Sequence, residues 1–254
     1  MASHLDKVRD DDSYADILAN WDAGFYAKFT DTLRPSRPGA RVLDIGCGVG
    51  QVVAALVKEG FEAHGVDVAS ANIDRARMES PRCLLYDGRR LPYRDGTFDT
   101  VGALNVLEHV QDPEVLVAEA VRVCVPGGRI VVSSPNFLRV LGWRDYHPRM
   151  RGVGNKWRNL HALLARRRHM QRDPASVRFE RMDPIIKTPF TPDDDAIVCT
   201  NLLDIEFFLR RNGCTVEVSA CTDRWVRPWM DRVLNATPLR YGLFNAFVVA
   251  RKAG

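Results

Sequence analysis

The feature that most limits the possible folds of this chain is the segment RVLDIGCGVG at residues 41–50, where a short apolar run ends in glycines at alternate positions. A helical pattern follows over residues 51–59. Glycine has no Cβ, so a buried strand that passes through such a turn into a helix can bring its bare backbone against a ligand. The segment therefore predicts a strand, a ligand-binding turn and a helix.

Two acids flank this turn. Asp44 lies two residues before the first glycine, and Asp67 ends a second apolar run at residues 62–67. An acid at the tip of the second strand can accept hydrogen bonds from both hydroxyls of a ribose. Asp44 would repel a pyrophosphate, but its carboxylate suits the ammonium group of an amino acid. The pair therefore favours S-adenosylmethionine (SAM), which has an ammonium group, an adenosine and no phosphate, over a dinucleotide.

Further motifs follow in order along the chain. They are Asp87-Gly88 after a predicted third strand (82–86), Asn105 at the end of a fourth, Glu108-His109, the helix start Asp112-Pro113, and Pro126-Gly127-Gly128 before a fifth strand (129–134). Asp112 suits an N-cap, and Pro113 suits the first helical position. Through these motifs, residues 40–135 resemble the class I SAM-dependent methyltransferases, of the ubiquinone and menaquinone type that acts on small molecules.

This resemblance implies both a fold and a cofactor site. We expect an α/β fold with a Rossmann-like, doubly wound sheet of seven strands, the last antiparallel, with helices on both faces and an inserted cap after the fifth strand. The expected cofactor is SAM, which leaves as S-adenosylhomocysteine. Its predicted binding residues are Asp44, Gly46, Cys47, Gly48, Asp67, Val68, Asp87, Gly88 and Asn105. Asp44 is expected to face the methionine ammonium and Asp67 the ribose. Val68 is expected to cover the adenine, with Asp87 at its edge.

We predict a single methyltransferase domain over residues 1–254. Its parts are an N-terminal helical cover (1–38), the SAM-binding core (39–135), a basic substrate-cap insert (136–200), and a C-terminal part (201–254) with one helix and strands six and seven. The helix is expected over residues 201–211 and the strands over 214–220 and 244–251. In the cover, Tyr14 or Trp21 is expected either to close the cofactor pocket or to lie in the core.

Cysteine usage and hydropathy indicate a compartment. Six cysteines show neither a C-x-x-C pair nor another metal-ligand spacing, so they are expected as reduced thiols, several of them in the core. No apolar run reaches the roughly eighteen residues of a membrane span, and the polar residues 1–13 are unlike a signal peptide. We therefore predict a cytoplasmic protein, with peripheral contact to the inner membrane surface as an option.

The predicted insert is strongly basic. Residues 136–182 hold eleven Arg and one Lys against three acids, a net charge of +9, whereas the whole chain carries +4. Three functional interpretations stay open: a cap that binds an anionic substrate, a membrane-surface helix near a lipid-linked substrate, and an RNA-binding patch. RNA ranks third, because no nucleic-acid module accompanies the arginines. A solvated basic lid is the plain alternative.

A second segment with exposed-type aromatics lies near the C-terminus. Residues 223–234 place Trp225, Trp229 and Val233 at i, i+4 and i+8 among arginines. Such tryptophans can line an apolar pocket or sit at a membrane interface. Packing against the edge of the sheet is the third option.

Catalysis leaves fewer traces in the sequence. Methyl transfer is an in-line displacement on an activated carbon, so positioning supplies much of the rate, and a general base helps a hydroxyl acceptor. The predicted catalytic residues are His109 and His147, with Tyr146 and Asp145 as weaker candidates. We expect the methyl group to go to a hydroxyl oxygen of a small-molecule or lipid-linked acceptor. If the basic insert is a substrate cap, this acceptor is anionic. The alternatives are an RNA methyltransferase and a non-catalytic SAM-binding protein.

A metal is not predicted. The run from Asn105 to His109 is similar to the E-x-x-E-H pattern of ubiquinone-type O-methyltransferases, which is implicated in binding a divalent metal. This chain keeps Glu108 and His109, but Asn105 replaces the first acid, and losing a carboxylate weakens a site for a hard cation. The acids at 193–195 are expected in a solvated loop, with a second oxygen-rich site as the alternative.

Overall fold

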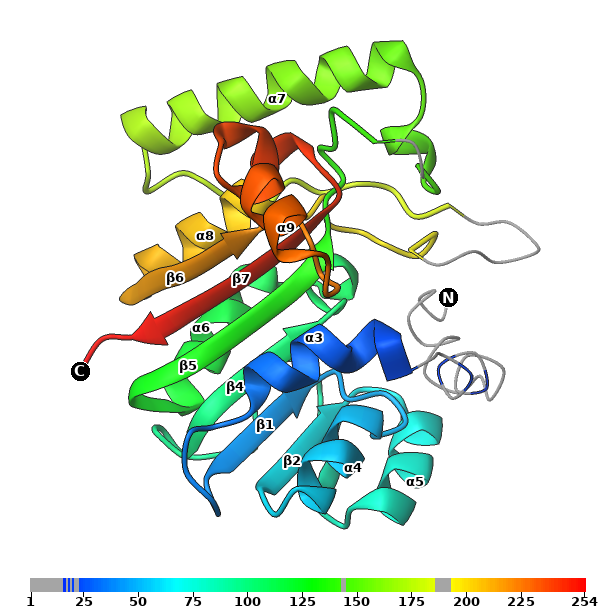
Figure 1. Ribbon diagram of the computed structural model, residues 1–254, viewed down its shortest axis with the longest axis vertical. Coiled ribbons are helices and arrows are strands. Elements are labelled where there is room, and N and C mark those ends of the chain that lie inside the picture. Colours follow the sequence, from blue (N-terminus) through cyan, green and yellow to red (C-terminus); the bar gives the residue numbers. More distant parts are fainter. Residues whose placement is uncertain (1–15, 17, 19, 21–22, 143–144, 186–192) are drawn as a thin grey trace. The chain divides into compact units, whose positions relative to one another are not determined.

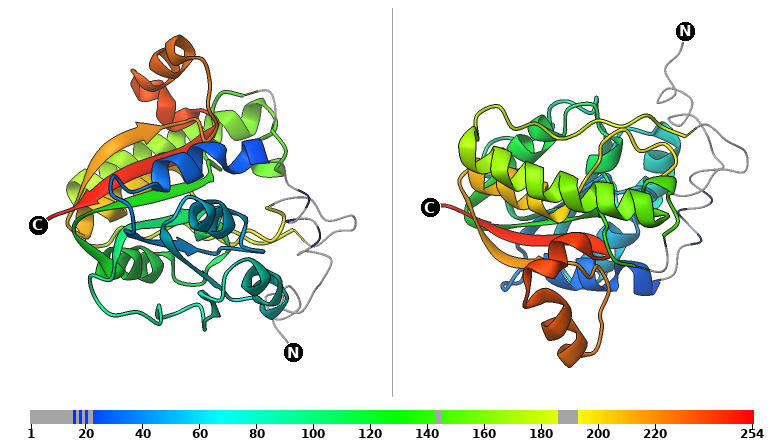
Figure 2. Two further views of the ribbon diagram at one scale, coloured as in Figure 1. Left: turned by 60° about the horizontal axis from the view of Figure 1, so that its bottom comes forward. Right: turned by 90° about the horizontal axis from the view of Figure 1, so that it is seen from above.

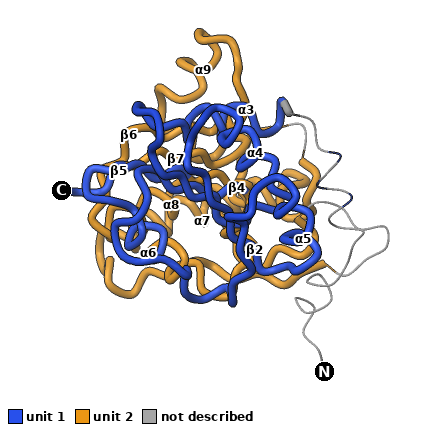
Figure 3. The backbone as a smooth tube through the Cα atoms, turned by 90° about the horizontal axis from the view of Figure 1, so that it is seen from below, with its two compact units in different colours: residues 1–104, 119–131, 251–254 blue, residues 105–118, 132–250 orange. Residues whose placement is uncertain are grey.

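The structure is a computed structural model, and it describes residues 16, 18, 20, 23–142, 145–185 and 193–254 (Figure 1). The predicted roles of Tyr14 and Trp21 therefore fall outside the described residues. The chain comprises two compact units, coloured separately in Figure 3. Unit 1 comprises residues 1–104, 119–131 and 251–254, and unit 2 comprises residues 105–118 and 132–250. The prediction of a single domain stays a prediction.

A seven-stranded sheet runs through both units in the order β3-β2-β1-β4-β5-β7-β6. The strands are β1 (Arg41–Ile45), β2 (Glu62–Asp67), β3 (Cys83–Leu85), β4 (Phe98–Leu104), β5 (Cys124–Pro135), β6 (Cys214–Ala220) and β7 (Asn245–Lys252). Strand β1 pairs in parallel with both β2 and β4. The arrow of β7 in Figure 1 points opposite to that of β6. The predicted Rossmann-like sheet with its antiparallel last strand is confirmed.

Helices of unit 1 follow directly from the sequence pattern. They are α3 (Ala23–Leu33), α4 (Gln51–Lys58) and α5 (Ser70–Glu79); α6 (Pro113–Val123) is shared by the two units. Helix α4 begins after the glycine turn and buries an apolar face. Gly102 in β4 lets α3 pack closely, because an added Cβ would lie 2.7 Å from side-chain atoms of Phe29 and Leu33.

Unit 2 contains the predicted insert and the C-terminal elements. Its helices are α7 (Val153–Arg172), α8 (Leu202–Arg211) and α9 (Pro228–Asn235), with 3₁₀ turns η1 (Leu107–His109), η2 (Pro148–Met150) and η3 (Pro238–Gly242). Figure 2 shows α7 lying over α8. The insert has its own buried apolar cluster: Phe137, Leu138, Met150, Leu163, Ala196 and Cys199. Asn201 caps α8 by accepting the Asp204 N–H at 3.0 Å, as its position before the apolar run suggests.

Two details of unit 2 and the cysteines bear on the predictions. Trp225, Trp229 and Val233 are each more than 60% exposed, which contradicts one of the three alternatives, packing against the sheet edge. All six cysteines are buried as free thiols. Among the helices that the structure describes, none combines the length and apolarity needed to cross a bilayer.

Candidate functional site

The glycine turn of unit 1 has a backbone that requires glycine. Gly46, Gly48 and Gly50 have φ values of 70°, 53° and 86°, in the left-handed region. An added Cβ would lie 3.1 Å from Leu18 Cδ1 at Gly48 and 3.1 Å from the Ala76 Cα at Gly50. The turn therefore presents backbone rather than side chains, as a cofactor loop must.

Asp67 at the end of β2 holds this turn in place. Its carboxylate accepts the N–H of Gly48 at 3.0 Å and of Ala69 at 2.9 Å, and the Asn72 side chain at 3.3 Å. Burial raises the pKa of Asp67, and these hydrogen bonds oppose the rise. The acid is thus positioned at the strand tip predicted for ribose recognition, with an additional role in ordering the loop.

Asp44 in β1 is buried, and no hydrogen bond to its side chain occurs among the described residues. Burial, helped by the nearby Cys83 and Asp67, raises the pKa of Asp44 well above its usual range. A buried carboxylate without a counter-charge favours a cationic ligand group, because the ligand's charge would offset the desolvation cost. Asp44 therefore fits the methionine ammonium of SAM.

Cys47, Val68 and Asp87 follow the parallel strands β1, β2 and β3 of unit 1, and so lie at the same end of the sheet. Val68 is half-buried directly after β2. The Cys47 side chain is buried against Gly65, so only its backbone is available to a ligand. Asp87 is exposed and accepts the N–H groups of Arg89 and Arg90 at 2.8 Å and 3.1 Å, which makes it a turn former ahead of Gly88. An adenine contact of Asp87 stays a prediction.

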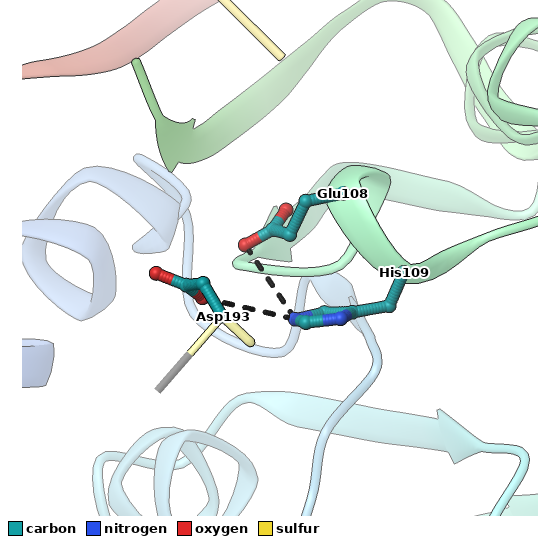
Figure 4. Close-up of side chains that lie close together, drawn as sticks. All are labelled: Glu108, His109 and Asp193. Atoms are coloured by element: carbon teal, nitrogen blue, oxygen red, sulfur yellow. Dashed lines mark ion pairs between the residues drawn. The ribbon is translucent and has the colours of Figure 1, made fainter. Parts of the chain in front are cut away.

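Unit 2 brings together three side chains of the kind that can ligate a metal, two of them adjacent in sequence and one distant (Figure 4). Glu108 and His109 come from η1, and Asp193 comes from the far end of the insert. His109 Nε2 lies 3.9 Å from Glu108 Oε1 and 3.9 Å from Asp193 Oδ1. The three donor atoms lie within 4.8 Å of one another. Two carboxylates and an imidazole are a donor set that could hold a divalent cation.

Glu108 is the most constrained member of this set. Its side chain is 0% exposed, and Oε2 accepts the hydroxyl of Ser134 at 2.7 Å. Oε1 has no hydrogen-bond partner among the described residues, although it is buried and faces His109 and Asp193. Burial raises the pKa of Glu108 to about 7, against the opposing effect of His109. A buried carboxylate oxygen without a partner is costly, and a bound cation would satisfy it.

A fourth residue, Asp195, lies beside His109, although Nδ1 of His109 has no hydrogen-bond partner among the described residues. This Nδ1 lies 3.4 Å from Asp195 Oδ2, on the opposite side of the ring from the atom that faces Glu108 and Asp193. Burial lowers the pKa of His109, but the carboxylates of Glu108, Asp195 and Asp193 raise it more, and the net change is a rise. A carboxylate behind a histidine is the usual support of a metal-binding imidazole.

The segment that carries Asp193 is fastened to η1 through backbone groups. The N–H groups of Ile197 and Val198 donate to the Glu108 carbonyl at 2.8 Å and 3.1 Å. Asp194 and Asp195 are buried, and Asp193 has a left-handed φ of 65°. The prediction of a solvated acidic loop is therefore wrong: these backbone hydrogen bonds draw the segment against η1.

The remaining sequence candidates have different surroundings. Asn105 bends the chain after β4 with a φ of 52°, and its N–H donates to the Ser133 carbonyl at 2.8 Å. The Tyr146 hydroxyl donates to the Asp193 carboxylate, which places Tyr146 beside the cluster. Asp145 pairs with Lys156 Nζ at 2.6 Å and so has a structural partner.

His147 is buried and lies at the start of η2. Its Nδ1 accepts the Arg149 N–H at 3.2 Å and caps η2, and its ring packs edge-on against Phe137 at 5.0 Å between centroids. These contacts give His147 a local structural role, and the catalytic role predicted for it stays a prediction. The sequence analysis predicted neither Asp193 and Asp195 beside His109 nor Ser134 as the hydrogen-bond partner of Glu108. The acidic run was visible in the sequence, but nothing there linked it to η1.

Comparisons with known proteins agree with the fold and the glycine turn. Residues 43–132 match the family model described as a methyltransferase domain. Norajmaline N-methyltransferase of Rauvolfia serpentina is 36% identical over 109 residues, covering 39% of this chain and 37% of that protein. Ubiquinone biosynthesis O-methyltransferase of Idiomarina loihiensis is 34% identical over 124 residues, covering 44% and 48%. The chain thus spans less than half the length of each of these relatives.

A solved structure extends the likeness to the whole fold. An S-adenosylmethionine-dependent methyltransferase from Mesorhizobium loti superposes with a TM-score of 0.58 at 17% identity, covering 91% of this chain and 99% of that one. This chain therefore carries a methyltransferase domain on the fold of the class I SAM-dependent methyltransferases. SAM is the cofactor that this class implies, and Asp44, Asp67 and the glycine turn fit it.

Proposed function

We propose that this protein transfers a methyl group from SAM to a hydroxyl oxygen of a small-molecule or lipid-linked acceptor. The observation that carries the proposal is the convergence of Glu108, His109 and Asp193, with an unpartnered buried carboxylate oxygen, on a methyltransferase fold. Similarity to a ubiquinone O-methyltransferase supports an oxygen acceptor, whereas similarity to an N-methyltransferase supports only the transfer.

Unit 1 supplies the cofactor half of this proposal. Asp44 would pair with the methionine ammonium, the glycine turn would face the cofactor with bare backbone, and Asp67 would accept the ribose hydroxyls while holding Gly48. Parallel pairing of Ile45 with Ala103 makes the chain leave β1 and β4 at the same edge of the sheet. Ligands of open α/β sheets bind at this edge.

Unit 2 supplies the acceptor half. Glu108, His109 and Asp193 would hold a divalent cation such as Mg²⁺ or Mn²⁺, with Ser134 bonded to Glu108 and Asp195 beside His109. When bound, the cation would act as a Lewis acid that lowers the pKa of an acceptor hydroxyl. This assignment makes His109 a ligand rather than the general base predicted from the sequence. It also favours oxygen acceptors, because hard cations prefer oxygen.

Titration with Mn²⁺ alone tests the acceptor half. Electron paramagnetic resonance should detect one bound Mn²⁺ on the full chain, and Glu108→Gln or Asp193→Asn should each weaken its binding at least about tenfold. Asp183→Asn is the matched control, since Asp183 is an exposed acid of the same insert. If the wild-type chain binds no Mn²⁺, the cation assignment fails and His109 returns as the candidate base.

Product formation tests transfer itself. With SAM, Mn²⁺ and catechol as a hydroxylated probe, release of S-adenosylhomocysteine should depend on Glu108 and Asp193. A matched aromatic amine should give less product under the same conditions. A chain that binds S-adenosylhomocysteine but releases none with a broad panel of hydroxyl acceptors would instead be a non-catalytic SAM-binding protein.

A further inference from the structure

Helix α7 of the insert is long, entirely without acids, and partly apolar on its exposed side. Its 20 residues hold one lysine and five arginines, at 156, 158, 166, 167, 168 and 172. Val153, Trp157 and Leu164 are 74%, 60% and 46% exposed, although they are large apolar side chains. Their spacing of four and seven residues places them on one stripe of the helix. This stripe covers the first two thirds of a cylinder about 30 Å long.

The opposite side of α7 is firmly attached to the rest of unit 2. Asn159 donates to the carbonyls of Phe137 at 3.2 Å and Arg139 at 3.0 Å, and Leu163 lies in the buried cluster of the insert. Arg166 pairs with the buried Asp204 of α8. The exposed side is therefore a fixed, preformed surface rather than a fraying segment.

Most described arginines of the insert form hydrogen bonds or ion pairs within unit 2. Arg139, Arg149, Arg151, Arg166, Arg178 and Arg181 each bond to carbonyl or carboxylate groups of unit 2. In contrast, Arg158, Arg167, Arg168 and Arg172 form no ion pair or hydrogen bond with any residue that the structure describes. Among the described arginines of the insert, those without internal partners therefore all lie on α7.

We propose that the exposed side of α7 docks on the surface of an anionic phospholipid bilayer. Basic side chains around an apolar stripe are complementary to such a surface, where lipid phosphates meet acyl chains. Trp157 has the amphipathic ring that favours this interface. RNA binding would use the arginines but gives no reason for exposed Val153 and Leu164. The helix lies on the membrane and does not span it, in keeping with its many charges.

Vesicle sedimentation of the full chain tests this inference without any methyl acceptor. The chain should bind vesicles of equal parts phosphatidylcholine and phosphatidylglycerol, and not vesicles of phosphatidylcholine alone. Raised salt should weaken the binding. Each arginine near an anionic surface strengthens binding about fivefold, so changing Arg158, Arg167, Arg168 and Arg172 to Gln should weaken it at least about 100-fold. Trp157→Ser should weaken it about tenfold.

Two matched controls separate a docking surface from general charge. Changing the exposed Arg82, Arg89, Arg90 and Arg94 to Gln removes the same charge outside α7, and Trp229→Ser removes a tryptophan of similar exposure, 63%, from α9. Both variants should bind vesicles like the wild type. Equal losses in these controls would overturn the inference.

Competition with bulk tRNA tests whether the same surface binds RNA instead of lipid. The four-arginine variant of α7 could lose tRNA binding and still bind vesicles like the wild type. In that case the surface is an RNA site and the lipid inference is wrong. All variants are compared after their melting temperatures and their affinities for S-adenosylhomocysteine match the wild type. Binding to the cofactor site is measured separately from binding to vesicles. Failure to bind vesicles would therefore not contradict the proposed methyl transfer, and absence of methyl transfer would not contradict membrane docking.

Discussion

Asp67 orders the glycine turn in the structure, and we predict that the same carboxylate also binds a ribose. It orders the glycine turn through the Gly48 amide, and it retains acceptor capacity at the strand tip for a ribose. This geometry explains why an acid, rather than an amide, suits the position: a carboxylate has only acceptor sites, and both tasks need acceptors.

Asp67→Ala should weaken the binding of S-adenosylhomocysteine by ~1.5–3 kcal/mol, the size of a lost hydrogen bond to a charged group. Isothermal titration calorimetry measures this directly. Asp74→Ala is the control, because Asp74 lies in α5 with a side chain 75% exposed. Unchanged affinity in the Asp67 variant would remove Asp67 from the cofactor site.

Single residues also show why the charge count of the insert was a poor guide to its surface. The sequence places eleven arginines between residues 136 and 182, but several of them reach inward to carbonyl oxygens. Arg139, for example, is only 4% exposed and donates to the Phe244 carbonyl. Arginine carries five donors on a long side chain, so it can serve as an internal crosslink of irregular backbone.

The glycine turn shows how an element boundary depends on backbone space. Gly50 starts α4 and Gly60 follows its end, with similar φ values of 86° and 87°. An added Cβ would meet the Ala76 backbone at Gly50, whereas nothing lies within 4 Å at Gly60. Substitution at Gly60 therefore measures the backbone strain of a positive φ alone, whereas substitution at Gly50 measures the same strain plus a steric clash.

Gly60→Ala should lower the free energy of unfolding by about 1–2 kcal/mol, the cost of a left-handed non-glycine residue. Gly50→Ala should cost about 1–3 kcal/mol more, since α4 and α5 must move apart. Urea denaturation of the two variants measures the difference. Equal losses would show that the close approach at Ala76 relaxes freely.

Helices α7 and α8 are joined by a buried ion pair that predicts a pH effect. Burial raises the pKa of Asp204 to about 6, opposed by the Arg166 guanidinium and the Asn201 amide. Because the folded-state pKa lies above the unfolded value, protonation favours the folded state. The stabilising contribution is complete below about pH 4 and is lost as the pH rises through about 6.

The wild-type chain should therefore lose about 2 kcal/mol of stability relative to Asp204→Asn between pH 4 and pH 7. Denaturant unfolding of both proteins across this range gives the difference, in which other titrating groups cancel. A difference that stays constant with pH would mean that Arg166 fully compensates the buried carboxylate.

At the level of the whole molecule, the sheet order and the motif order agree with one class of protein. The sheet order changes direction between β1 and β4, which is where doubly wound folds bind their ligands. The first five strands have the order 3-2-1-4-5 that dinucleotide-binding folds also use, so this part of the sheet does not choose between the cofactors. The buried carboxylate of Asp44 favours an ammonium over a phosphate, and so favours SAM.

Thermal unfolding of the full chain tests that choice. At about 100 times its dissociation constant, S-adenosylhomocysteine should raise the melting temperature by roughly 5–10 °C, from a stabilisation of about 2.7 kcal/mol. NAD should give no rise. The reverse result would make the chain a dinucleotide-binding protein and would contradict the role of Asp44.

The elements themselves were largely predictable, and the candidate site only in part. Strand β6 matches its predicted range, and α8 begins one residue after the predicted start, because Asn201 caps it from outside. Local signals such as N-caps, glycine ends and apolar periodicity act within a few residues, so one sequence reveals them. The partners of His109 could not be found this way, since Asp193 and Asp195 reach it only through tertiary contacts.

The sequence by itself determined the alternating strands and helices, the glycine turn and the two acids of the cofactor site, because each depends on neighbours close along the chain. Tertiary structure alone decided that an acidic run of the insert lies against η1, and that only four described arginines of the insert, all on α7, lack internal partners. The physical reason is that burial and pairing depend on which distant segments meet. In this protein the backbone hydrogen bonds to Glu108 bring those segments together.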